Sequence, residues 1–115
     1  MNIQIFGSSK SFDSKKAERY FKERRIKYQY IDMKRYGISR GELQSVKNAV
    51  GFDKLVDSSA EDSVILKYLT GDEERLQKLF ENQDWINLPI VRNGKAATVG
   101  YAPDVWKEWK KKKSR

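Results

Sequence analysis

The chain has 115 residues, of which 38% are hydrophobic and 35% are charged, so we expect one folded domain over residues 1–115 with a densely ionic surface. It contains no cysteine and no histidine, which excludes disulfides, thiolate metal sites, thiol catalysis by the polypeptide as written, and the commonest zinc ligand. We therefore expect no metal and no cofactor. No apolar run is long enough to cross a bilayer, and residues 1–5 lack the charged and apolar regions of a signal peptide, so we expect a cytoplasmic protein that does not bind membranes.

Residues 3–21 predict a short apolar strand, a turn rich in glycine and serine, and a helix. The apolar residues Ala17, Tyr20 and Phe21 lie at positions i, i+3 and i+4, as on the buried face of a helix. A strand that enters a helix through such a turn directs several backbone N–H groups to one point, where the helix dipole adds partial positive charge. That point suits an anion or a cysteine thiolate. We expect Asp13 to cap the helix.

The next segment, residues 26–32, alternates apolar and polar side chains and predicts a second strand. Strand, helix and strand make a βαβ unit, so the two strands are expected to be parallel.

Residues 39–84 predict a helical block. Ser39 and Glu42 have the spacing of a capping box, and Gly51 is expected to end the helix that begins there. The polar residues 57–62 are expected to cap a short helix carrying the apolar cluster at 64–69. Another helix opens at residue 72 or 73 and buries three side chains: Leu76, Leu79 and Phe80.

Residues 88–101 predict a β-hairpin, because Asn93-Gly94 between two extended runs suits a type I′ turn. Pro89 stands at the start of the first of these strands, where a missing N–H does least harm. Pro103 opens a final helix. Its buried face is expected to hold Val105, Trp106 and Trp109, and Tyr101 is also expected to be a core residue. Stacking of Tyr101, Trp106 and Trp109 on nucleic-acid bases is the weaker alternative.

The formal charge is +8, and a basic tail over residues 107–115 carries six positive charges against Glu108 alone. A solvated helix end, with cations at the negative end of the dipole, is the favoured interpretation. The tail could also contact an acidic protein surface, and direct binding of nucleic acid through it is the weaker option.

Two stretches resemble one known family. Residues 5–21, from Ile5-Phe6-Gly7 to Tyr20-Phe21, are similar to the opening strand, cysteine turn and helix of the arsenate-reductase-like and Spx-like branch of the thioredoxin fold. Residues 88–101 are similar to the closing hairpin of that family. The resemblance implies an α/β fold with a four-stranded mixed sheet flanked by helices, and a helical insertion between the second and third strands. It also implies a cis Leu88-Pro89 bond bordering the active site.

The resemblance aligns Ser11 with the nucleophilic cysteine of the family and Ser14 with the second cysteine of its redox-switch members. The family usually has an arginine where this chain has Leu88, and another in the middle loop, where this chain reads Asp57-Ser58-Ser59-Ala60. The remaining candidates for weak binding of an oxyanion or peptide are Lys10, Phe12, Pro89 and Arg92.

The function predicted first is binding without thiol redox activity, by a monomer. One alternative is that the native protein is a thiol oxidoreductase of arsenate reductase or glutaredoxin type and that serine has replaced its cysteine. Another is a transcription regulator like the Spx proteins, which bind the C-terminal domain of the RNA polymerase α subunit. In that group a glycine after the insert helix lies on the polymerase-binding surface, and Gly51 is the nearest match.

Overall fold

The four strands form one mixed sheet in the order β2-β1-β3-β4. A computed structural model describes the backbone of residues 1–113 and the side chains of residues 1–111. The central strand β1 (Ile3–Gly7) pairs in parallel with β2 (Tyr28–Asp32) and antiparallel with β3 (Ile90–Asn93), which continues into β4 (Ala96–Val99). The predicted mixed sheet and the parallel βαβ unit are both confirmed.

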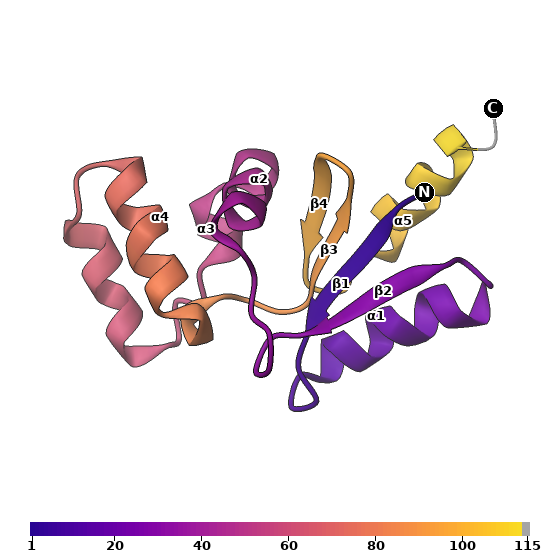
Figure 1. Cartoon of the computed structure of the whole chain (residues 1–115), viewed down its shortest axis with the longest axis horizontal. Helices are drawn as coiled ribbons and strands as arrows, with labels where there is room; N and C mark the ends of the chain where they lie inside the picture. Colours follow the sequence, from indigo (N-terminus) through magenta and orange to yellow (C-terminus); the bar gives the residue numbers. More distant parts are fainter. Residues whose placement is uncertain (114–115) are drawn as a thin grey trace.

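Helices cover both faces of this sheet (Figure 1). The helices α1 (Phe12–Glu23) and α5 (Pro103–Lys113) lie on one face, and α2 (Arg40–Val50) lies on the other. Between β2 and β3 the chain forms the predicted helical insertion. After α2 it contains α3 (Phe52–Leu55), the 3₁₀ helix η1 (Glu61–Tyr68), α4 (Asp72–Glu81) and the 3₁₀ turn η2 (Gln83–Trp85).

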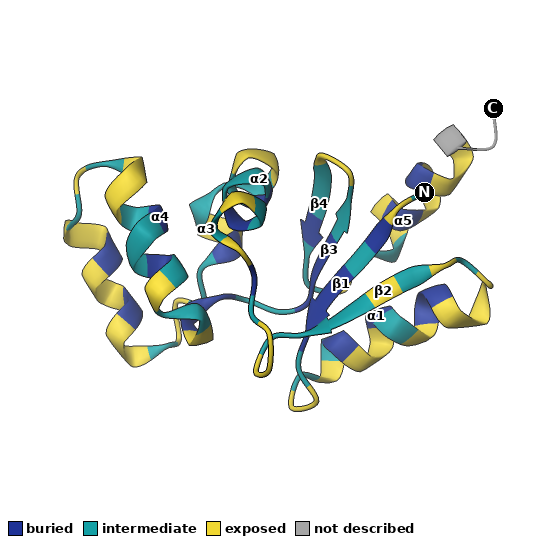
Figure 2. Cartoon of the chain, viewed as in Figure 1, coloured by how far each residue is buried: buried dark blue, intermediate teal, exposed yellow. Residues whose placement is uncertain are grey.

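Two apolar cores lie on opposite faces of the sheet because successive strand residues point to opposite sides. Ile5 and its neighbours on β1 and β3 pack with Phe21 and Trp106 beneath α1 and α5. Phe6 points the other way, into the core shared with α2 and the rest of the insertion. Figure 2 shows these buried positions running along β1 and along the inner sides of the helices.

The helix signals of the insertion are confirmed at α2. Ser39 Oγ accepts a hydrogen bond from the Glu42 amide (3.2 Å), and Glu42 Oε1 accepts one from the Ser39 amide (3.0 Å), which completes the capping box. Gly51 ends α2 with φ +84°, a conformation that glycine adopts without a steric penalty.

The hairpin turn differs by one residue from the prediction. Asn93 pairs with Ala96, so the two turn residues are Gly94 and Lys95 rather than Asn93 and Gly94. Only Gly94 has a positive φ (+62°), which matches a type II′ turn with glycine first instead of the expected type I′. Asn93 stays in the strand, and its Oδ1 accepts a hydrogen bond from the Asn2 amide at the start of β1 (3.2 Å).

The second strand begins at Tyr28, two residues later than predicted. The end of α1 uses the preceding residues, because Arg25 adopts φ +58° and the Ile26 amide donates back to the Phe21 carbonyl (3.0 Å). Ile26 therefore completes a helix end rather than starting a strand.

Three capping and burial predictions were wrong. The N-cap of α1 is Ser11, and Asp13 lies in the first turn. Residues 57–62 do not cap η1, because Asp57 Oδ1 instead accepts from the amide and hydroxyl of Ser59. Val105 is exposed, since α5 presents its neighbour Trp106 to the core.

Tyr101 is not a core residue, because 45% of its surface is exposed.

The two ends of the insertion are joined by Gln83, whose side-chain amide pairs with the backbone of one residue, Ile38, just before α2. Its Oε1 accepts from the Ile38 amide (3.0 Å) and its Nε2 donates to the Ile38 carbonyl (2.9 Å). Gly37 lies against this amide so closely that a Cβ there would come within 2.6 Å of Gln83 Oε1. The chain entering the insertion is thus fixed to the chain leaving it.

We predict that Gln83→Ala lowers the free energy of unfolding by about 1–3 kcal/mol, because two partly buried backbone groups of Ile38 lose their partners. Urea unfolding followed by tryptophan fluorescence measures the change. Gln44→Ala is the matched control, since the Gln44 side chain donates an exposed hydrogen bond to Asn48 on the same helix. Equal losses for the two variants would contradict the role given to Gln83.

Candidate functional site

The turn between β1 and α1, residues 8–14, is held by its serines. Ser11 has extended backbone angles and accepts a hydrogen bond on Oγ from the Ser14 amide (3.1 Å), as an N-cap residue does. Its own amide donates to the Ser8 carbonyl (3.0 Å). The Lys10 amide donates to Ser8 Oγ (3.2 Å). Several backbone N–H groups of the turn are therefore hydrogen-bonded within the turn itself.

Ser14 is fully buried and also bonded. Its Oγ accepts from the Ser8 amide (3.2 Å), which links the first turn of α1 back to the end of β1. The neighbouring Gly7 has no room for a side chain: a Cβ there would lie 2.8 Å from Ser14 Oγ and 2.6 Å from Tyr30 Oη. Gly7 is a site residue that the sequence analysis missed, and its only signal was a glycine at the end of a buried strand.

Tyr30, on β2, closes the buried side of the serine turn. Burial raises its pKa above the ordinary tyrosine value, the negative charges of Glu18 and Asp32 raise it further, and a hydrogen bond from Ser14 offsets part of the rise. The pKa of Tyr28 is raised by burial and by Glu18, whose Oε2 accepts from the Tyr28 hydroxyl at 2.9 Å. Both tyrosines therefore stay protonated near neutral pH, so Tyr30, the one that lies beside Ser14, does not act as a base there.

Lys10 and Phe12 lie on the outer side of the same turn. Lys10 is exposed, and Phe12 exposes 79% of its surface. The structure thus brings four of the predicted site residues, Ser11, Ser14, Lys10 and Phe12, into one turn, with the serines inward and the other two outward. Four of its amides, those of Ser8, Lys10, Ser11 and Ser14, already donate hydrogen bonds within the turn.

Pro89 lies at the same end of the sheet. The Leu88-Pro89 bond is cis, as predicted. Phe6 pairs with Ile90, so the antiparallel register continues with Pro89 beside Gly7, the residue from which the serine turn starts. Pro89 is buried, and its carbonyl accepts from the Gly100 amide (2.8 Å).

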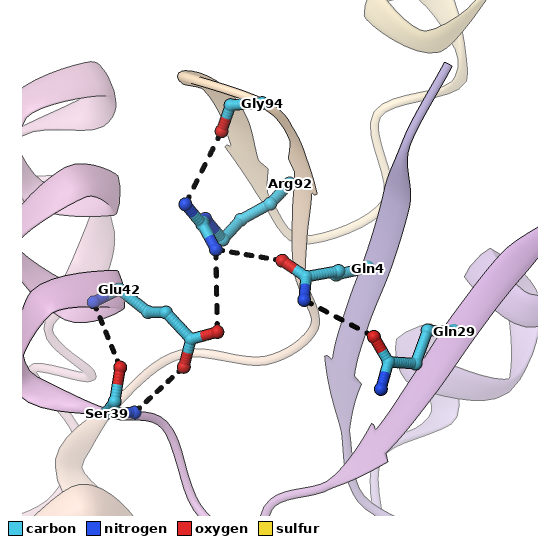
Figure 3. A network of polar contacts seen from close by, with 6 residues as sticks. All are labelled: Gln4, Gln29, Ser39, Glu42, Arg92 and Gly94. Atoms are coloured by element: carbon cyan, nitrogen blue, oxygen red, sulfur yellow. Dashed lines mark hydrogen bonds and ion pairs between the residues drawn. The ribbon is translucent and has the colours of Figure 1, made fainter.

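Arg92 is not brought to the serine turn. It pairs with Gln4 in the register of β1 and β3, and its side chain lies on the α2 face of the sheet, opposite α1 (Figure 3). Its Nη1 donates to Gln4 Oε1 (2.8 Å) and lies 3.6 Å from Glu42 Oε2, and its Nη2 approaches the Gly94 carbonyl (3.5 Å). Arg92 joins the sheet to the capping box of α2.

The two positions where the resemblance leads one to expect arginines hold no cation. Leu88 packs against the apolar core on the α2 face, and residues 57–60 form a turn closed by Asp57. No three His, Cys, Asp or Glu side chains gather into a possible metal site within the described part of the chain. No helix among the described residues is long and apolar enough to cross a membrane.

Gly51 lies on the insertion, between α2 and α3. A Cβ at this position would meet no atom within 4 Å, so the residue faces open space. The next residue, Phe52, lines a cleft of about 390 Å³ between α3 and η1, together with Val56, Val64 and Arg75.

The chain was compared with known proteins. No family model matches it, and no curated protein matches it. Solved structures do resemble it over nearly its whole length. An arsenate reductase from Vibrio cholerae has a TM-score of 0.79 and an ArsC-family-related protein from Bacteroides fragilis one of 0.78; each is 20% identical and covers 94% of this chain and 97% of its own. The YffB (PA3664) protein has a TM-score of 0.80 at 19% identity, over 93% of this chain and 97% of its own.

At this level of identity the likeness concerns the fold. The chain has an arsenate-reductase-like thioredoxin fold, a four-stranded mixed sheet flanked by helices, and it contains no cysteine. The chemistry of those proteins does not follow from the fold.

We predict that Ser11→Ala lowers the free energy of unfolding by about 1 kcal/mol, because the Ser14 amide loses its acceptor. Ser11→Asp should retain most of the stability, since a carboxylate caps a helix and interacts favourably with its dipole. Chemical denaturation of the unmodified protein and of the two variants measures the three free energies of unfolding. If aspartate destabilises as much as alanine, Ser11 has a role other than capping.

Proposed function

We propose that this protein is a cytoplasmic, monomeric binding protein that keeps the arsenate-reductase-like fold but carries out no thiol redox chemistry. The observation that supports this most directly is the state of the two serine hydroxyls. Ser11 Oγ caps α1, and Ser14 Oγ is buried and bonded to the Ser8 amide. Both are used as structural groups.

The chemistry of serine agrees with this proposal. A serine hydroxyl is activated as a nucleophile by an adjacent base, and the chain has no histidine. The raised pKa values of Tyr28 and Tyr30 keep those hydroxyls neutral. A serine also cannot form the disulfide on which thiol reductases depend, so the alternative of a native oxidoreductase requires a cysteine at position 11.

Weak binding of an oxyanion or a peptide at the serine turn remains part of the proposal. Lys10 supplies a positive charge there, and the start of α1 supplies the positive end of a helix dipole. A lysine cannot grip an oxyanion in two places as an arginine pair does, so we expect millimolar affinity, about 4 kcal/mol.

We predict that the protein as given shows no NADPH-coupled reduction of arsenate or of disulfides when glutathione, glutaredoxin and thioredoxin are supplied. Turnover that rises in proportion to purified protein would contradict this.

Ser11→Cys should carry a thiol with a pKa below the ordinary value of about 8.5, because the start of α1 and Lys10 stabilise a thiolate. Thiolate absorbance during a pH titration measures it. Ser58→Cys, at an exposed position of the insertion, is the matched control. Equal pKa values for the two thiols would refute the thiolate-stabilising character of the turn. Turnover by Ser11→Cys alone would favour the oxidoreductase alternative.

A regulator that binds the RNA polymerase α subunit is the second candidate, supported by the open surroundings of Gly51 and the adjoining cleft at Phe52. We expect Gly51→Arg to weaken binding to the C-terminal domain of that subunit at least tenfold in calorimetry. Gly71→Arg, which also enters open space on the insertion, controls for the added charge, and Gly51→Asn controls for the positive φ. No binding by the unmodified protein would remove this candidate.

A further inference from the structure

Acidic and basic residues are unevenly distributed: the acids are in excess in the later part of the insertion, and the bases are in excess in the rest of the chain. Residues 52–85, in the insertion, contain nine acidic and four basic residues, a net charge of −5. The rest of the chain contains 20 basic and seven acidic residues, a net charge of +13. The overall charge of +8 therefore understates how basic the chain is outside residues 52–85.

The basic residues are densest on α1 and at its end, where residues 12–25 hold six cations: Lys15, Lys16, Arg19, Lys22, Arg24 and Arg25. None of them forms an ion pair with any side chain among the described residues. The same stretch holds three acids, Asp13, Glu18 and Glu23, of which Glu18 accepts a hydrogen bond from Tyr28. By contrast, Arg40 and Lys47 of α2 are both paired with acids of α4.

The outer side of α5 continues the same surface. Trp106 of α5 packs against Tyr20 and Phe21 of α1, with ring centroids 5.1 and 5.0 Å apart, so the two helices lie together on one face of the sheet (Figure 1). Both turn their remaining sides to solvent, where α5 adds the exposed residues Lys107, Lys110 and Lys111. We call the solvent side of α1 and α5 the basic face.

Exposed aromatic rings lie among these cations. Lys16 Nζ lies 5.5 Å from the centre of the Tyr101 ring, which is 45% exposed at the start of α5. Phe12, one helical turn before Lys16 on the same side of α1, is 79% exposed. Tyr101 also packs edge-on against the buried Trp106, with ring centroids 5.5 Å apart, but both it and Phe12 leave a large part of their rings open to water near Lys16.

We propose that the basic face binds single-stranded nucleic acid, with its cations against the phosphates and with Tyr101 and Phe12 stacked on bases. Cations that follow a backbone, together with aromatic rings that accept any base, are how proteins hold single strands. An acidic protein surface would use the charges but not the open rings, and a duplex hides its bases. The acidic insertion would be repelled by the strand and would point away from it. The proposal adds a ligand to the proposed binding function but uses neither serine.

The test is fluorescence anisotropy of a labelled single-stranded oligonucleotide, about 20 nucleotides long so as to exceed one site, titrated with the full chain at low salt. We expect binding that weakens steadily as salt rises. The double variant Lys16→Glu/Arg19→Glu should weaken it at least tenfold. Lys54→Glu/Lys67→Glu makes the same change in charge at two exposed positions of the insertion and should have less than a threefold effect. Equal effects of the two double variants, or no binding by the unmodified chain, would overturn the proposal.

The rings are tested separately. Tyr101→Ala should weaken binding about tenfold and Tyr101→Phe should not, with circular dichroism showing that both variants fold. If Tyr101→Ala binds as well as the unmodified chain, or if polyglutamate or a duplex of equal charge competes as well as the single strand, the ligand is not a single strand. The oligonucleotide assays involve no thiol chemistry. A lack of oligonucleotide binding would therefore leave the proposed absence of redox activity untouched, and redox turnover would leave the proposed binding of single strands untouched.

Discussion

The structure depends on the close approach of α1 to the end of β1. Tyr30 and Ser14 leave no room for a Cβ at Gly7, and the buried Ser14 hydroxyl accepts a hydrogen bond from the Ser8 amide where the strand meets the helix. This contact fixes where α1 crosses the sheet, and the packing of Tyr20 and Phe21 against Trp106 follows from it. A larger residue at position 7 would force α1 outward and open the core beneath it.

The same contact explains how serines fit at this turn of the fold. Serine is close to cysteine in size, and its hydroxyl makes stronger hydrogen bonds than a thiol does. At position 11 it supplies a helix cap, and at position 14 a buried link between strand and helix. The two residues that the resemblance aligns with cysteines therefore stabilise the turn as serines.

Much of the fold could be predicted from local sequence signals. The capping box of α2, the glycine that ends it and the proline that opens α5 each follow from the chemistry of one or two residues. The hairpin turn was misplaced by one residue because Asn93 has a use that only the folded sheet reveals, its hydrogen bond with the Asn2 amide. Arg92 was assigned to the wrong place for a similar reason. Which face of the sheet it occupies, and its pairing with Gln4 and Glu42, depend on the register of β3 rather than on neighbouring residues.

The side-chain amide of Gln83 affects how the length of the insertion can vary between related sequences. Because it joins the residue entering the insertion to the turn leaving it, the sheet is attached to a closed loop of chain whose two ends are held together. The helices after α2 could be lengthened or shortened without altering the distance that the two ends must span, whereas α2 is held to the sheet by the shared core and by the contact of Glu42 with Arg92. The lengths of those later helices are thus freer to vary than the length of α2, although their buried side chains must still fit the core that they share with the sheet.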